Sequence, residues 1–232
     1  RRGGMQRIPR PAGARPGTPA PWAARAGSDR RVTLANLQDC FANLGPARRS
    51  PREGHAERAS AVLAALYEAD GETWIVLTRR AAALRVHGGE VSFPGGGQDP
   101  GEALVDTAQR EAWEEIGLEP AEVTIIGELD HLTTVTSNSF IVPYVAVLPG
   151  RPELMASPGE VDAILHVALS ELLGPAVFRE ERWDFGGREQ PIWFFELEGD
   201  TVWGATASML VQLLGFVTAT MGRGDLERVR GR

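Results

Sequence analysis

The segment Gly96–Leu118, with the sequence GGQDPGEALVDTAQREAWEEIGL, organises the interpretation of the whole chain. Within it Glu111, Glu114 and Glu115 are spaced at i, i+3 and i+4, so on a helix they share one face. Three carboxylates this close repel one another at neutral pH unless a hard cation lies between them. The spacing therefore predicts a divalent-cation site, with a solvated acidic helix face as the ordinary alternative.

The residues around these glutamates favour the cation site. The segment agrees at every defined position with the pattern G-x5-E-x7-R-E-U-x-E-E-x-G-U, in which U is apolar: Gly96, Glu102, Arg110, Glu111, Ala112, Glu114, Glu115, Gly117 and Leu118. This pattern resembles the signature of the Nudix hydrolase family. The resemblance implies a divalent-metal-dependent hydrolase of nucleoside diphosphate derivatives. It also implies an α/β (α+β) fold, an α/β/α sandwich with a mixed sheet.

The signature helix is expected over Ala103–Ile116, because Gly117 suits a left-handed helix end. In one continuous helix Glu102 and Arg110 would lie about 12 Å apart along the axis. Their pairing therefore requires the preceding loop to fold back, as the family pattern implies. The resemblance assigns Arg110 the role of orienting Glu111, and the alternative is an ordinary surface ion pair.

The same resemblance implies the other parts of a catalytic site. Mg2+ or Mn2+ would be bound by Glu111, Glu114 and Glu115, with the alternative that one of the three positions water instead of binding the metal. Gly95 or Gly96 would lend a backbone carbonyl. The general base would be one of these glutamates or a carboxylate from a later loop, for which Glu160 is the candidate, against the alternative of an exposed loop charge.

A second motif lies just before the first. Its residues are Leu77-Thr78-Arg79-Arg80-Ala81, then Arg85, Gly89 and Phe93-Pro94-Gly95-Gly96, and they resemble the signature of the coenzyme A pyrophosphatase branch of the family. The late segment Trp203-Gly204-Ala205-Thr206-Ala207 is similar to a W-G-x-T-A element of that branch. The resemblance implies cleavage of coenzyme A or acyl-CoA to 3',5'-ADP and (acyl-)4'-phosphopantetheine.

Two arginines of the second motif are expected to bind the substrate. Arg80 and Arg85 could each place a guanidinium fork on phosphate oxygens, and Arg85 could instead tie its loop to a carboxylate of the signature helix. Two other functions stay open. One is hydrolysis of another nucleoside diphosphate derivative, such as ADP-ribose, a nucleotide sugar or an oxidised nucleotide. The other is a regulator that binds a nucleotide without turnover.

Composition limits the partners and the compartment. The first 31 residues carry eight arginines and one aspartate, which leaves a formal charge of −14 on the rest of a chain whose net charge is −7. An acidic body argues against broad nucleic-acid binding. No apolar run is long enough to span a membrane, and the single cysteine, Cys40, suits a reducing compartment, so cytoplasm is expected. Whether the chain forms a homodimer stays open.

The chain is expected to form one domain with two extensions. Residues 1–31, rich in Arg and Pro, are predicted to be a disordered leader, residues 32–221 the Nudix hydrolase domain, and residues 222–232 a flexible tail. Apolar periodicity predicts helices over Thr33–Leu44 and Ala205–Thr220. Strands are predicted over Arg58–Tyr67, Thr73–Thr78, Val123–Leu132, Phe140–Leu148, Glu160–Val167 and Gln190–Leu197.

Overall fold

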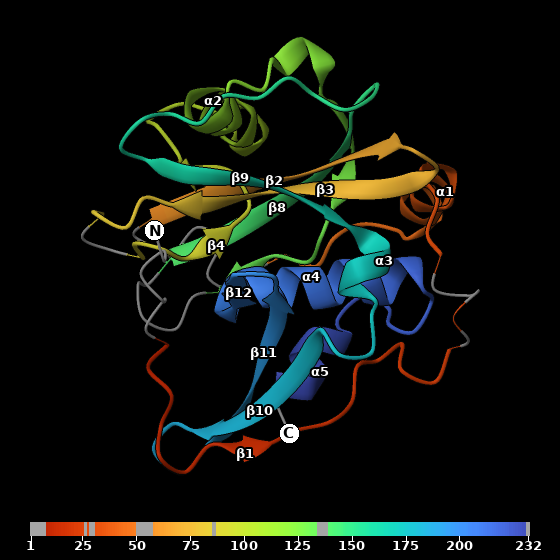
Figure 1. The fold of residues 1–232 in the computed structure, drawn as a ribbon, viewed down its shortest axis with the longest axis vertical. Coiled ribbons are helices and arrows are strands. Elements are labelled where there is room, and N and C mark those ends of the chain that lie inside the picture. The colour runs from red at the N-terminus through yellow and green to blue at the C-terminus, as the bar shows by residue number, and fades with distance from the viewer. Residues whose placement is uncertain are drawn as a thin grey trace.

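A long mixed sheet forms the centre of the molecule (Figure 1). The computed structural model describes residues 8–25, 27, 31–49, 58–84, 87–133 and 139–230. Within this part of the chain, β2 pairs in parallel with β8 and all other pairings are antiparallel. The central sheet comprises β2 (Arg58–Ala69), β3 (Glu72–Arg80), β4 (Val91–Ser92), β5 (Gly95–Gly97), β6 (Thr124–Glu128), β7 (Leu132–Thr133), β8 (Ser139–Val147) and β9 (Val161–Ala168).

Helices cover both faces of this sheet. In Figure 1, α2 lies above the sheet and α4 below it. The remaining helical elements are short or lie at the edges. The bounds are α1 Leu34–Asn43, α2 Leu104–Ile116, α3 Leu169–Leu172, α4 Gly204–Val217 and α5 Asp225–Arg230, with a 3-10 turn, η2, at Pro120–Glu122. The predicted mixed-sheet sandwich is confirmed.

The alternating side chains of β2 build two apolar layers. Leu63, Ala65 and Tyr67 face the α2 layer, whereas Ala64 and Leu66 belong to the larger core that includes α1 and α4. All five are completely buried. Alternation of this kind follows from the two-residue period of a strand, and here both faces of the strand are covered. The sheet is thereby a fixed platform under α2.

Local sequence signals account for several elements. Thr33, at the start of the predicted helix, caps α1: its hydroxyl accepts the N–H of Asn36 at 3.1 Å. β2 and β3 meet at Asp70-Gly71, where both residues have positive φ (54° and 73°), as a two-residue hairpin turn requires. The predicted strand Val123–Leu132 is divided into β6 and β7.

A second sheet extends below α4, and it was not predicted as a unit. Its strands, in the order β1-β10-β11-β12, are β1 (Arg15–Pro16), β10 (Phe178–Asp184), β11 (Glu189–Leu197) and β12 (Asp200–Trp203). Of these strands, only β11 was predicted. The strand Phe178–Asp184 shows no alternation of apolar and charged residues, because two of its glutamates, Glu180 and Glu181, are buried. The sequence pattern therefore did not indicate a strand.

The prediction of a disordered leader over residues 1–31 is wrong for residues 8–25. Arg15 and Pro16 pair with β10, and Trp22 is buried between Phe178 and Phe195. The buried carboxylate of Glu180 accepts both the N–H and the hydroxyl of Thr18, at 3.1 and 3.0 Å. Apolar periodicity could not reveal this segment, because it is held by one tryptophan and by polar contacts to distant strands.

The predicted flexible tail over residues 222–232 also needs correction. Residues Asp225–Arg230 form α5, and Leu226 in its first turn is only 3% exposed.

Among the helices in the described residues, none is long and apolar enough to cross a membrane.

Candidate active site

α2 holds the three glutamates of the signature in the predicted arrangement. Ala108, Ala112 and Ile116 are fully buried and pack the helix against the sheet. The helix ends at Gly117, whose φ of 69° is left-handed and whose N–H donates to the carbonyl of Trp113 at 2.8 Å. Since the apolar stripe fixes how the helix is rotated, the glutamate face is directed along the sheet surface toward β5.

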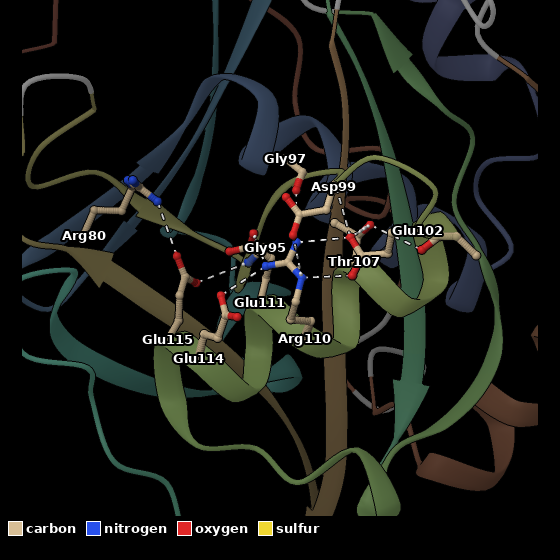
Figure 2. A network of polar contacts seen from close by, with 11 residues as sticks. Arg80, Gly95, Gly97, Asp99, Glu102, Thr107, Arg110, Glu111, Glu114 and Glu115 are labelled. Carbon is tan, nitrogen blue, oxygen red and sulfur yellow. Dashed lines mark hydrogen bonds and ion pairs between the residues drawn. The ribbon is translucent and has the colours of Figure 1, made fainter.

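Arg110 lies at the centre of the site, between Glu102 on one side and two signature glutamates on the other (Figure 2). Its Nε and Nη2 donate to the two carboxylate oxygens of Glu102, at 2.9 and 3.2 Å. Its Nη1 donates to Glu111 at 2.9 Å and to Glu114 at 3.0 Å. The loop before α2 therefore folds back as predicted, and one guanidinium fixes three carboxylates.

Besides binding Arg110, Glu102 also fixes the loop before α2. The hydrogen bond from Arg110, followed by the one from Thr107, lowers the pKa of Glu102 to about 2. Thr107 donates at 2.7 Å, and the backbone N–H of Asp99 adds a third contact at 3.2 Å. Thr107 was not identified from the sequence, because a threonine within a helix carries no pattern that marks a loop contact.

The glycines of β5 let the backbone approach the glutamates. A side chain on Gly96 would place its Cβ 2.4 Å from the carboxylate carbon of Glu111. Gly95 has a φ of 157°, and its Cβ would lie 2.3 Å from the carbonyl oxygen of Ala61. The N–H of Gly95 donates to Glu115 at 3.2 Å. The structure thus brings both predicted glycines to the glutamate cluster.

Glu115 is the most buried of the three glutamates, with only 5% of its surface exposed. Burial raises its pKa to about 7, against the opposing effects of the Gly95 N–H and of Arg80, whose Nη1 lies 3.5 Å away. Nearby Glu111 and Glu160 raise it further. Burial also raises the pKa of Glu111. The hydrogen-bond donors and arginines around Glu111 and Glu115 therefore only partly offset the cost of burying their negative charges.

This arrangement fits a divalent cation. The carboxylate oxygens are hard donors, and an added positive charge would offset the negative charge that burial and mutual repulsion disfavour. In the described residues, no three acidic, histidine or cysteine side chains are already gathered as a metal cluster. Arg110 instead holds the carboxylates of Glu111 and Glu114.

The remaining predicted residues are placed as follows. Arg80, at the end of β3, points toward Glu115 (Figure 2). Glu160 is exposed in the turn before β9, where its backbone carbonyl accepts the N–H of Ala81 at 2.8 Å. Its negative charge contributes to the raised pKa values of Glu111 and Glu115. Arg85 lies outside the described residues.

The family follows from a direct comparison. A family model described as NUDIX domain matches residues 57–186, more than half of the chain. The chain belongs to the Nudix family. An uncharacterized Nudix hydrolase NudL of Cronobacter sakazakii is 34% identical over 183 residues, covering 78% of this chain and 93% of the relative. Nudix hydrolase 3 of Caenorhabditis elegans is 30% identical over 200 residues, and this alignment covers 78% of this chain and 83% of the relative.

The fold agrees with this assignment. The crystal structure of a MutT/nudix family protein from Enterococcus faecalis matches this fold with a TM-score of 0.53 at 13% sequence identity. The match covers 85% of this chain and 79% of the Enterococcus chain. This Nudix hydrolase is a pyrophosphatase that acts on phosphoric anhydrides, and its substrate class is nucleoside diphosphate derivatives.

Proposed function

We propose that this Nudix hydrolase cleaves coenzyme A or acyl-CoA to 3',5'-ADP and (acyl-)4'-phosphopantetheine, with Mg2+ or Mn2+ as the cofactor. The observation that carries the proposal is the convergence of two motifs. The earlier motif, which resembles the coenzyme A pyrophosphatase signature, supplies Arg80, Gly95 and Gly96, and these lie against Glu115 and Glu111 of the later one. This closeness of Arg80 and Gly95 to the glutamates supports a role for the earlier motif at the same site.

In this proposal each side chain has a separate task. Glu111, Glu114 and Glu115 would hold the cation. The bound cation would offset the negative charge of the diphosphate and lower the pKa of a water molecule. Arg110 keeps Glu111 and Glu114 in place. Arg80, with 30% of its side chain exposed, is close enough to Glu115 to donate to a phosphate oxygen at the same site.

The reaction itself is a hydrolysis of one P–O–P bond. Water attacks one phosphorus, its proton passes to a carboxylate, and the bridging oxygen leaves with the other phosphorus, so two phosphate monoesters form. Glu160 or one of the signature glutamates accepts the proton. Arg85 is proposed as a second phosphate ligand from the motif alone. We also propose a cytoplasmic location, since Cys40 is the only cysteine.

The test is hydrolysis in H2 18O with Mg2+ or Mn2+, analysed by mass spectrometry. Coenzyme A, acetyl-CoA, dephospho-coenzyme A and ADP-ribose are compared at equal concentration. We expect coenzyme A or its thioester to have the highest kcat/KM, with one 18O atom incorporated into a single product. A higher kcat/KM for ADP-ribose would contradict the proposed substrate but leave the pyrophosphatase reaction intact.

A further inference from the structure

The end of β3 carries two consecutive arginines that face opposite sides of the central sheet. Leu77 belongs to the core that includes α4, and Val76 belongs to the α2 layer. Because side chains alternate along a strand, Arg79 shares the face of Leu77 and Arg80 shares the face of Val76. Arg80 accordingly lies toward Glu115, and Arg79 is directed to the other side of the sheet.

On that other side Arg79 meets Asp200, the first residue of β12. Nη1 of Arg79 donates to both carboxylate oxygens of Asp200, at 3.2 and 3.1 Å. The side chain of Asp200 is only 10% exposed and that of Arg79 is 34% exposed, so water and salt screen this pair less than a surface pair. In Figure 1, β12 lies below the central sheet, on the side opposite α2. The contact therefore ties the end of β3 to the second sheet.

Asp200 is carried by a well-packed part of the fold. It faces Leu197 across the turn between β11 and β12, and Val202, two residues later, is completely buried. β12 leads directly into α4, in which residues 206–216 are all buried. Since β12 and α4 are held by the core, Asp200 is a fixed point to which Arg79 is attached.

The sheet itself holds the end of β3 less regularly than its middle. Pairing with β9 shifts register between Arg79 and Arg80, so that Asp162 is an extra residue of β9 at this point. Such a bulge interrupts the ladder and bends the strand. On the other edge β3 has only the two residues of β4 and the turn before it, where Gly89 and Glu90 exchange backbone hydrogen bonds with Arg80. A side-chain anchor at Arg79 therefore adds a constraint that the ladder lacks here.

We propose that Asp200 and Arg79 are positioning residues for the pyrophosphatase reaction, which hold the end of β3 so that the guanidinium of Arg80 lies beside Glu115. Both act from the opposite face of the sheet. The 3.5 Å contact from Nη1 of Arg80 to Glu115 is too long to fix Arg80 by itself. The inference rests on the proposed task of Arg80 as a phosphate donor, and it does not depend on which nucleoside diphosphate derivative is cleaved.

The test is steady-state kinetics of Asp200→Ala in two backgrounds, the wild-type chain and Arg80→Ala, with coenzyme A and with ADP-ribose in Mg2+. In the wild-type background kcat/KM should fall about tenfold or more, because misplacing a group by about 1 Å costs up to about a hundredfold. In the Arg80→Ala background the same substitution should change kcat/KM less than about twofold, since no guanidinium is left to misplace. Asp200→Asn, which keeps an acceptor, should have an intermediate effect and replaces Asp200→Ala if that variant does not fold.

Glu196→Ala is the matched control. Glu196 lies in the same hairpin as Asp200, and its side-chain partners, Arg179 and Thr201, both belong to the second sheet. Its truncation breaks an ion pair of that sheet without removing a contact to β3. We expect kcat/KM of this variant to remain near the wild-type value, whereas a loss equal to that of Asp200→Ala would overturn the proposal.

Amide hydrogen exchange provides a readout that needs no turnover. The N–H of Arg80, which donates to the carbonyl of Glu90 at 2.9 Å, should exchange faster in Asp200→Ala. The N–H of Leu148, which donates to the carbonyl of Leu66 at 2.8 Å, should exchange at its wild-type rate. Equal acceleration of both amides would mean a general loss of stability and would contradict a positioning role.

Two kinetic results would also overturn the inference. One is an equal fall of kcat/KM on Asp200→Ala in both backgrounds, and the other is a wild-type kcat/KM in Asp200→Ala or in Arg80→Ala. The effect of Asp200→Ala is taken as a ratio to its parent with each substrate. A preference for ADP-ribose over coenzyme A would therefore contradict the proposed substrate alone and leave the role of Asp200 supported by its own ratio.

Discussion

At the scale of the residue, Glu115 shows how folding places a carboxylate in surroundings that disfavour its negative charge. The helix pattern puts it next to Glu111, but the sheet and the β5 glycines bury it, and burial is the largest cause of its raised pKa. Arg80 at 3.5 Å offers only a long ion pair. A carboxylate in this position is costly when it is charged and alone, and becomes favourable when a divalent ion joins it.

This cost predicts a pH-dependent stability of the metal-free protein. The folded pKa of Glu115, about 7, lies above the ordinary value of 4.5, so the folded state binds this proton more tightly. Stability from this group is therefore complete below about pH 4.5 and is lost as the pH rises toward 7. In EDTA, Glu115→Gln should match the wild-type Tm near pH 4.5 and exceed it by several degrees at pH 7.5, while activity with Mg2+ falls at least about a hundredfold.

The matched control for this measurement is Glu119→Gln, which changes an exposed carboxylate just beyond α2. Its Tm should follow the wild-type value at both pH values. A difference between Glu115→Gln and the wild-type chain that stays the same from pH 4.5 to 7.5 would show that burial of this charge is not the cause.

At the scale of the element, α2 and β5 work as a pair. The helix supplies the carboxylates, and the glycine strand lets backbone come within contact distance of them. The three consecutive glycines have different surroundings: Gly95 faces backbone of β2, Gly96 faces the carboxylate of Glu111, and a Cβ added to Gly97 would meet no heavy atom within 4 Å. If Glu111 acts as proposed, Gly96 is needed for activity, because it alone of the three faces that carboxylate.

Alanine substitutions at Gly96 and Gly97 test this difference. Gly96→Ala should displace Glu111, because the end of a flexible side chain yields more easily than backbone, and kcat should fall about tenfold or more with Tm changed by no more than a few degrees. Gly97→Ala is the control and should keep near wild-type kcat. Steady-state kinetics and thermal unfolding of both variants suffice, and equal kcat values for the two would remove the steric role of Gly96.

At the scale of the whole molecule, the N-terminal segment completes the small sheet. Trp22 is 1% exposed, and its ring lies 5.5 Å from that of Phe178 and 6.3 Å from that of Phe195. Arg10 pairs with the buried carboxylate of Glu181 at 2.8 Å. Residues that composition would assign to a solvated leader therefore contribute to the core of the fold.

Trp22→Ala should accordingly destabilise the protein by about 3–5 kcal/mol, the usual cost of truncating a large buried aromatic side chain. Urea denaturation followed by circular dichroism measures the change. Trp113→Ala removes the same side chain from a position that is 51% exposed, and should alter the unfolding free energy by about 0.5 kcal/mol or less. Equal, small effects of the two substitutions would mean that the N-terminal segment does not stabilise the fold.

Elements differ in how far their sequence predicts them, and the reasons are physical. The Asp70-Gly71 hairpin, the Thr33 cap and the Gly117 helix end were predictable because each depends on a few neighbouring residues. β10 and β12 were missed because their burial depends on partners far along the chain. Buried Glu180, for example, is compensated by Thr18, Arg182 and Trp193.

The sequence by itself determined the helical face of Glu111, Glu114 and Glu115 and the family to which the chain belongs, because helix periodicity and motif spacing are local properties. Only the tertiary structure decided which of these carboxylates is buried, that Arg110 joins three of the signature's acidic groups, and that Arg80 faces Glu115. It also decided that residues 8–25 belong to the fold. Burial and charge pairing are set by groups distant in sequence, and for these no local pattern carries a signal.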